Sequence, residues 1–249
     1  MSIARAFVAL GVALATLVGI VAVAGPANAG QPPAGYPTSE KMDTAGNAQI
    51  GNIPIRRGFW DADIDKGWGM DKAWNKHNLW SVAAMKAVLH SSNITPQGTQ
   101  YLLKAYAGKS YCSGNPQICR VTDRREIRAV VDPKSHKLYH GWPVGGVMGM
   151  QTMFCEQQGI WRCPNWVTYS ILNPGKHNPY NSFVTDGDLD VPVGEKLRAE
   201  QYLLSDEQAE EQAEMMSSPE IVELERQIDS GEVQLLFSFD PLPDEYPAA

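Results

Sequence analysis

Residues 111–164 read YCSGNPQICRVTDRREIRAVVDPKSHKLYHGWPVGGVMGMQTMFCEQQGIWRCP. This stretch contains all four cysteines of the chain and its densest group of arginines. The runs over 125–131 and 147–154 are rich in β-branched and other apolar residues, a composition typical of β-strands. The stretch therefore predicts a small antiparallel sheet that is crosslinked by disulfides and carries positive charge.

The cysteines occur as two local pairs. Cys112 and Cys119 flank a loop rich in Gly, Asn and Pro, and Cys155 and Cys163 flank a second polar loop. Four cysteines allow three connectivities. We expect the two local pairs, because short polar loops bring their ends together with little strain, and each crosslink stabilises the fold by roughly 2–3 kcal/mol. A zinc site is the competing interpretation, but neither spacing is C-x-x-C. We expect no metal and no cofactor.

The first 29 residues have the pattern of a secretory signal peptide. Arg5 precedes an apolar run over 7–25, and Ala27-Asn28-Ala29 has the small residues of a cleavage site. The alternative is a retained anchor, since the run is just long enough to span a bilayer. No second long apolar run follows. We therefore expect an exported protein, secreted or in the cell envelope, with no transmembrane segment after the leader.

Composition divides the rest of the chain into three parts. Residues 30–54 are rich in Gly, Pro, Ala and Asn, which predicts a flexible linker. Residues 55–185 would form the disulfide-stapled domain, and residues 186–249 an acidic, mostly helical C-terminal extension. The expected fold class is α+β, in which short N-terminal helices pack on the small antiparallel sheet. One such helix is predicted over 82–90, with Ser81 as its N-cap.

Charge is distributed unevenly along the chain. Residues 186–249 contain 18 acidic and 3 basic residues, a net charge of −15, whereas the residues before them have a net charge of +8. Ser205 with Gln208 resembles a capping box, and Ser218-Pro219 is typical of a helix start. Residues 233–239 alternate like a half-buried strand, so we expect the extension to dock. It would bind a protein partner, or mimic the polyanion that the basic body binds.

Two groups of polar residues are candidates for chemistry. His77 can act as an acid or base near neutral pH, and the adjacent Lys76 can stabilise a developing phosphorane charge. The alternative is a structural histidine at a helix junction. An arginine cluster can contact phosphate, or form a solvated strand surface. A D-x-D-x-D run from Asp61 lacks the Gly and Glu of a calcium-binding EF-hand loop. The clustered arginines are Arg120, Arg124, Arg125 and Arg128.

The order of several short motifs resembles a superfamily of small ribonucleases that includes barnase, EndoU, the tRNA-cleaving colicins and RelE. These motifs are Gly67-Trp68-Gly69, Lys76-His77-Asn78, Val130-Val131-Asp132 and Gln151-Thr152-Met153-Phe154. Over residues 65–157 the resemblance implies one or two helices on a four-stranded antiparallel sheet. It also implies that His77 is the acid/base, Lys76 and Arg128 contact phosphate, and Thr152 is a polar partner on a late strand.

The chain departs from the secreted toxin domains of that superfamily in three features, its own leader, its paired cysteines and its acidic extension. It also resembles short exported proteins of actinobacteria and their phages. Two functions follow as hypotheses. The first is an exported, soluble binding or interaction module of the cell envelope or exterior, with the C-terminal extension as the surface for a protein partner. The alternative is a secreted, metal-independent ribonuclease that uses His77 and binds RNA or another polyanion at its basic body. Because the sequence contains no G-x-S-x-G, H-E-x-x-H or phosphate-loop motif, it favours the first.

Overall fold

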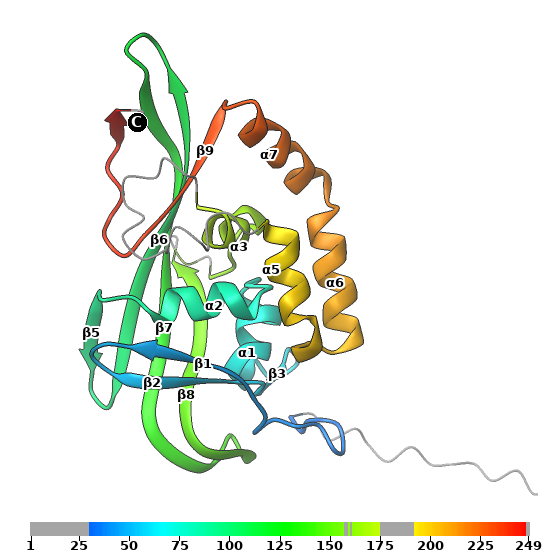
Figure 1. The fold of residues 1–249 in the computed structure, drawn as a ribbon. Helices are drawn as coiled ribbons and strands as arrows, with labels where there is room; N and C mark the ends of the chain where they lie inside the picture. The colour runs from blue at the N-terminus through cyan, green and yellow to red at the C-terminus, as the bar shows by residue number, and fades with distance from the viewer. Residues whose placement is uncertain (1–29, 157–158, 160, 175–191, 248–249) are drawn as a thin grey trace, which may run out of the picture.

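A computed structural model describes residues 30–156, 159, 161–174 and 192–247. A six-stranded antiparallel sheet is built around two long strands, β6 (Gln100–Ser113) and β7 (Ile118–Tyr139) (Figure 1). On its second side β7 pairs with β8 (Trp142–Glu156) and, near its start, with β10 (Glu245–Pro247). On the far side of β6 lie β5 (Ile94–Gln97) and β9 (Val233–Ser238).

One face of the sheet is apolar because side chains of a strand alternate between its two faces. Ile127 and Ala129 of β7 pair in register with Ala105 and Leu103 of β6, and all four are fully buried. This face forms the main core with α2 (Val82–Leu89) and α3 (Asn165–Leu172). The opposite face, called the outer face below, carries the intervening polar residues, such as Arg128.

The predicted fold class, short N-terminal helices on a small antiparallel sheet, is wrong. More residues lie in strands than in helices, the described fold begins with strands, and the sheet is long. The sheet is longer than predicted because β7 and β8 continue through residues that usually end strands. Pro133 lies where the register shifts between Asp132 and Ser135, and Pro143 is paired with Leu138. Irregular pairing lets a strand continue past a residue that cannot donate a backbone hydrogen bond.

Residues 41–56 form a β-hairpin, where the sequence predicted a flexible linker over 30–54. Its strands are β1 (Lys41–Asn47) and β2 (Gly51–Arg56), and Ile53 and Ile55 of β2 are buried in the main core. The backbone of β2 passes so close to β8 that a Cβ at Gly149 would lie 2.1 Å from the carbonyl oxygen of Pro54. Only glycine fits at this crossing.

A second hairpin leads into the helical part of the domain. It consists of β3 (Phe59–Asp61) and β4 (Lys66–Trp68), and it is followed by α1 (Gly69–Asp71) and a π-helix, η1 (Lys72–Lys76). The predicted N-cap of α2 is confirmed, because Ser81 Oγ accepts a hydrogen bond from the amide of Ala84 at 3.1 Å.

The acidic extension is an integral part of this fold. Its helical elements lie along one side of the molecule, and β9 then enters the sheet (Figure 1). The predicted capping box of Ser205 and Gln208 and the N-cap Ser218 are both confirmed. Leu235 and Phe237 of β9 are buried in the main core, so the extension completes the core. The helical elements are α5 (Val193–Glu200), η2 (Gln201–Leu203), α6 (Asp206–Met216) and α7 (Pro219–Asp229).

Both predicted disulfides are present. Cys112–Cys119 closes the hairpin between β6 and β7, and Cys155–Cys163 ties the end of β8 to the start of α3. Disulfides are typical of oxidising compartments and fit an extracellular protein. Of the helices in the described part of the chain, none is long and apolar enough to cross a bilayer. The predicted signal peptide, residues 1–29, lies outside the described residues.

Candidate functional site

His77, the predicted acid/base, follows η1 and is only 4% exposed. Its Nδ1 lies 2.9 Å from the carbonyl oxygen of Trp161, so this nitrogen carries a proton and donates it. Its ring packs against Phe154, with the ring centroids 5.5 Å apart. Burial lowers the pKa of His77 to about 4, and the nearby charges of Lys72 and Lys76 act in the same direction. At neutral pH the imidazole is therefore neutral and shielded from solvent.

The ammonium group of Lys76 is engaged with the β3–β4 hairpin. Its Nζ lies 2.5 Å from the carboxylate of Asp65 and 4.7 Å from the ring centroid of Trp60. Lys72, four residues earlier, lies over the same ring at 5.9 Å. An ion pair and a cation–π contact thus hold Lys76 in place and neutralise its charge.

Arg128 lies on the outer face of the sheet in a charge network. Its Nε donates to the carboxylate of Glu126 at 2.7 Å, and its guanidinium also contacts Glu156 on β8. Lys104 on β6 pairs with the same Glu126 at 3.3 Å. Two carboxylates therefore balance two cations here.

Thr152 of β8 is buried, and its hydroxyl has no hydrogen-bond partner among the described residues. Phe154 lies two residues further along β8, on the same side of the strand, and is the register partner of Arg128. Of the predicted site residues, His77 is the one whose ring packs against Phe154, while Thr152 and Arg128 are its neighbours in the strand register. Lys76 turns towards Asp65 and Trp60 on the β3–β4 hairpin.

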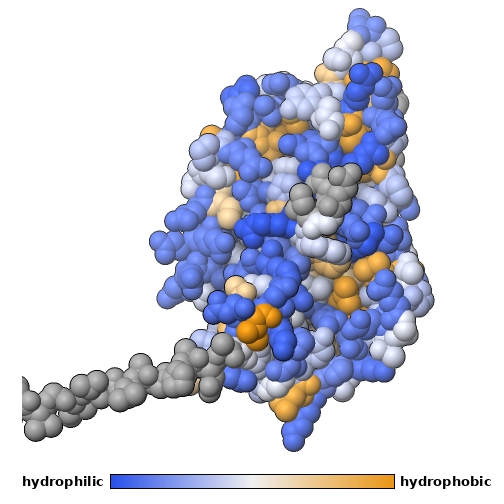
Figure 2. Space-filling view, turned by 180° about the vertical axis from the view of Figure 1, so that it is seen from behind, coloured by the Kyte–Doolittle hydropathy of each residue, from blue (hydrophilic) through white to orange (hydrophobic). Residues whose placement is uncertain are grey.

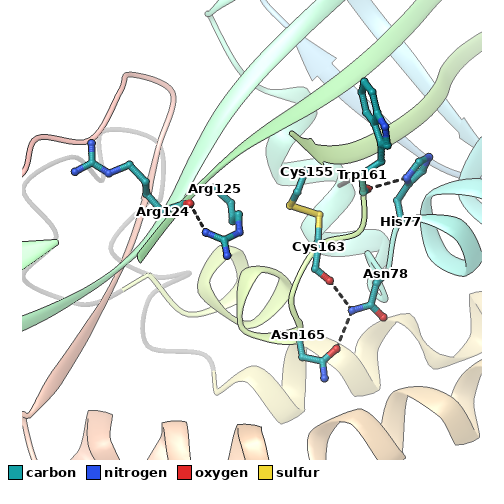
Figure 3. Close-up of a disulfide and its surroundings, with 8 residues drawn as sticks. All are labelled: His77, Asn78, Arg124, Arg125, Cys155, Trp161, Cys163 and Asn165. Carbon is teal, nitrogen blue, oxygen red and sulfur yellow. Dashed lines mark hydrogen bonds between the residues drawn. A yellow bond between two sulfur atoms is a disulfide. The ribbon is translucent and has the colours of Figure 1, made fainter. Parts of the chain in front are cut away.

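The Lys76-His77-Asn78 motif clamps the loop that the second disulfide closes (Figure 3). The amide of Cys163 donates to the carbonyl of His77 at 2.8 Å, and Asn78 Nδ2 donates to the carbonyl of Cys163 at 2.8 Å. Asn78 has a φ of 61°, a left-handed conformation that asparagine tolerates well. Arg162 donates to Asn78 Oδ1 at 3.0 Å. These contacts give the motif a structural role.

The four arginines of the predicted phosphate-binding surface do not share one face. Arg124 and Arg125 are adjacent on β7 and point away from each other (Figure 3). The guanidinium of Arg125 lies 5.8 Å from the ring centroid of Trp166 in α3, on the core side. Each arginine also contacts an acid. The partners of Arg120, Arg124, Arg125 and Arg128 are, in order, Glu245, Asp244, Asp123 and Glu126.

Glu200 is a buried carboxylate that sequence reasoning missed. It lies at the end of α5, where it accepts hydrogen bonds from the Ala83 amide at 2.7 Å and from Ser81 Oγ at 3.1 Å. These donors are at the N-terminus of α2, where a helix favours negative charge. Gln212 of α6 donates to the other oxygen at 2.7 Å. Burial raises the pKa of Glu200. Because these residues are far apart in sequence, no local pattern reveals the contact.

Asp71 forms a second buried junction between the extension and the body. Its carboxylate accepts hydrogen bonds from the Tyr36 hydroxyl and from Gln208 Nε2 of α6. Burial raises the pKa of Asp71 to about 6, although these hydrogen bonds and nearby Arg57 oppose the shift. Arg57 also donates to the carbonyl of Leu203 at 3.0 Å. Two buried polar junctions therefore fix α5 and α6 on the body.

The outer side of α6 and α7 is acidic. The acids of α6 have no ion-pair partner within the described part of the chain, although Glu211 accepts a hydrogen bond from Trp74 Nε1 at 2.6 Å. Tyr202, just before α6, is 83% exposed. Seen from behind, the molecule is mostly hydrophilic, with separate hydrophobic patches (Figure 2). We call the following exposed residues the acidic helical surface: Asp206, Glu207, Glu210, Glu214, Glu220, Glu223 and Asp229.

The chain matches no protein-family model, no curated protein and no solved structure. The resemblance to small ribonucleases therefore stays a prediction. The function of this chain is inferred from its own residues.

Proposed function

We propose that this protein is an exported binding module, and that its acidic helical surface binds a positively charged partner outside the cell. One observation carries the proposal. The clustered arginines of the body contact acids of the same chain, whereas the four exposed acids of α6 pair with no cation among the described residues. Complementary charge across an interface speeds association and selects partners of opposite sign.

The acidic helical surface is held in a fixed position, which favours binding. Glu200 and Gln212 join α5 and α6 to the start of α2, and Gln208 joins α6 to Asp71. A surface that is ordered before binding loses less conformational entropy when its partner arrives. Exposed Tyr202 supplies an aromatic contact next to the acids, and tyrosine is enriched among the residues that dominate binding energy.

The surroundings of His77 also favour a binding module over a ribonuclease. A general acid or base works best when its pKa is near the working pH and its ring reaches the substrate. His77 has a pKa of about 4, is buried, and donates Nδ1 to a backbone carbonyl.

Charge reversal tests the proposed surface. The substitutions Glu210→Lys and Glu214→Lys lie on the outer side of α6, away from its buried contacts. Isothermal titration with a deca-lysine peptide at 50 mM and 200 mM salt measures the interaction. We expect at least a tenfold loss of affinity in this double variant at low salt.

The matched control has the same change in net charge at exposed acids elsewhere, Asp63→Lys with Asp240→Lys. It should retain most of the affinity. Equal losses in the two double variants would show that only net charge matters and would overturn the assignment to α6. Cleavage of a fluorescent RNA by the wild type, abolished by His77→Ala in a folded protein, would establish the ribonuclease instead.

A further inference from the structure

Gly30 is held by both of its backbone groups. Its nitrogen lies 2.6 Å from Oδ2 of Asp61 in β3, and its carbonyl oxygen accepts a hydrogen bond from Nε1 of Trp142 at 2.9 Å. Trp142 is buried at the start of β8 and packs against Phe59 of β3, with the ring centroids 5.0 Å apart. Residue 30 is therefore fixed between the β3–β4 hairpin and β8.

Position 30 is suited to glycine. Its φ of 96° lies in the left-handed region, and a Cβ atom there would lie 2.7 Å from Cδ1 of Ile64. Gly30 is also buried. The contact with Asp61 is thus made by a backbone nitrogen at a position that leaves no room for a side chain.

The Asp61 carboxylate pairs with no cation in the described part of the chain, and the hydrogen bonds that it accepts there come from backbone nitrogens. Its Oδ1 accepts from the amides of Asp63 and Ile64 at 2.9 Å and 3.4 Å, within the turn of the β3–β4 hairpin. Its Oδ2 faces the nitrogen of Gly30. Because partial burial of a carboxylate is costly unless a positive charge compensates it, a positive charge at this nitrogen would stabilise the hairpin.

The sequence has a cleavage signal directly before this nitrogen. Ala29 and Ala27 are the small residues at the first and third positions before the bond between residues 29 and 30. Cleavage of that bond would convert the nitrogen that faces Asp61 into an α-amino group. A sequence pattern and a structural contact, which are independent observations, thus point to the same atom.

From this juxtaposition we infer that hydrolysis of the Ala29–Gly30 bond is a maturation step, after which the α-ammonium group of Gly30 forms an ion pair with Asp61. The oxygen of one water molecule goes to Ala29 as part of a carboxylate, and its two hydrogens go to the nitrogen of Gly30, which becomes an ammonium group. The catalyst is a peptidase that selects small residues at positions 27 and 29. A charged donor binds a carboxylate more strongly than a neutral amide does, so cleavage stabilises the hairpin.

The β3–β4 hairpin also contacts η1. Asp65 forms an ion pair with Lys76, and the ring of Trp60 forms a cation–π contact with the same ammonium group. The ion pair at Gly30 would therefore stabilise the surroundings of η1 as well. This inference does not depend on the proposed protein partner, because Gly30 and Asp61 lie outside the acidic helical surface.

The exported protein shows where cleavage occurs. The chain is expressed with its own leader in a secreting host, and the protein is collected outside the cytoplasm. Its intact mass and its N-terminal sequence identify the first residue, which we expect to be Gly30. A retained leader, or a mature form that starts at any other residue, would overturn the inference.

An insertion tests the α-ammonium group itself. A Gly-Ser dipeptide placed between Ala29 and Gly30 keeps the cleavage signal but moves the ammonium group two residues away from Asp61, while the amide of Gly30 can still donate. Hydrogen exchange of peptides that cover residues 59–68 measures opening of the β3–β4 hairpin. We expect exchange about fivefold faster than in the exported wild type, because a charged hydrogen bond is replaced by a neutral one. Peptides from the β1–β2 hairpin should not change.

Asp61→Asn completes the test, because asparagine keeps a carbonyl oxygen for the turn but has no charge. This substitution alone should accelerate exchange by a similar factor, and adding the insertion should have no further effect, since both changes remove the same ion pair. Asp63→Asn, at an exposed acid of the same hairpin, is the matched control and should exchange like the wild type.

Two results of the exchange experiment would overturn the inference. One is an insertion variant that exchanges like the wild type, and the other is a combined variant in which the two effects multiply. Neither result bears on the deca-lysine titration, so the two proposals fail separately.

Discussion

Asp71 and His77 are buried titratable residues on either side of η1, and burial acts on them in opposite directions. Loss of solvent disfavours the charged form of each group. For the Asp71 carboxyl this raises the pKa to about 6, and for the His77 imidazole it lowers the pKa to about 4. Acidification from pH 7 to pH 4 therefore stabilises the fold through Asp71 and destabilises it through His77.

The first prediction concerns Asp71→Asn. The pKa of Asp71 in the folded protein, about 6, exceeds its ordinary value of 3.8. The contribution of Asp71 to the free energy of unfolding is therefore complete below about pH 4 and is lost as the pH rises through 6. Asparagine stays neutral throughout. We expect the free energy of unfolding of the variant, relative to wild type, to be higher at pH 7.5 than at pH 4.5 by about 2 kcal/mol. Urea unfolding at both pH values measures this, with exposed Asp63→Asn as the control. If the difference in the free energy of unfolding between variant and wild type were the same at both pH values, the prediction would be wrong.

The second prediction concerns His77→Asn, which can keep a donor towards the carbonyl of Trp161. The folded pKa of His77 is lower than the ordinary 6.5, so its contribution is present above pH 6.5 and is lost as the pH falls through 4. When the pH falls from 7.5 to 4.5, the free energy of unfolding of the wild type should therefore decrease by about 2 kcal/mol more than that of the variant. Exposed His90→Asn is the control for the same urea experiment. A variant with the pH dependence of the wild type would show that His77 does not titrate as its burial requires.

At the scale of elements, the two disulfides have different surroundings. Cys155 and Cys163 are buried in the main core, whereas Cys112–Cys119 lies near the end of the β6–β7 hairpin beside a smaller cluster. Loss of a native disulfide costs about 2–5 kcal/mol.

We therefore expect the double substitution Cys155→Ala with Cys163→Ala to lower the free energy of unfolding by about 4 kcal/mol. The double substitution Cys112→Ala with Cys119→Ala should lower it by about 2 kcal/mol. Urea unfolding of the two double variants under oxidising conditions compares them directly. The reverse order would mean that the hairpin end contributes more to the fold than the core disulfide does.

Helix starts in this chain were predictable because their signals are local. Ser81, Ser205 and Ser218 each accept a hydrogen bond from an amide three residues later, as their sequence context predicted. The lengths of β7 and β8 were not predictable, because continued pairing across Pro133 and Pro143 depends on the neighbouring strand. The hairpin over 41–56 was missed for a similar reason, since its few apolar residues form no run.

The candidate site was predictable in part. The sequence identified the Lys76-His77-Asn78 motif and the arginines as candidate functional residues, but it did not identify the carboxylates that pair with the arginines. Glu245 pairs with Arg120 across more than half of the chain, and Glu156 meets Arg128 only because β8 lies beside β7. Long-range partners such as Glu245 and Glu156 leave no local pattern, whereas Asp123 and Glu126 lie two residues from the arginines that they contact.

At the scale of the whole molecule, the acidic extension supplies part of the main core and one strand of the sheet. Removal of residues 232–249 would uncover β6 along its pairing with β9 and expose the core side of Ala107. We expect this truncated chain to lose cooperative urea unfolding and to bind the dye ANS, because exposed apolar surface binds it. Asp244→Asn with Glu245→Gln is the control. It removes the ion pairs to Arg124 and Arg120 but keeps both strands, and it should unfold cooperatively. Cooperative unfolding of the truncated chain would show that the body is an independent domain.

The pairing of β9 with β6 also sets the order of events at synthesis. A strand that begins at residue 233 finds its neighbour more than a hundred residues earlier, so a ribosome must extend the chain past β9 before this pairing can form. Until then the edge of β6 presents unpaired amides and carbonyls, a template on which other chains can assemble. The exposed edge of β6 is therefore protected only once β9, which follows α7 in the chain, has been synthesised and has paired with it.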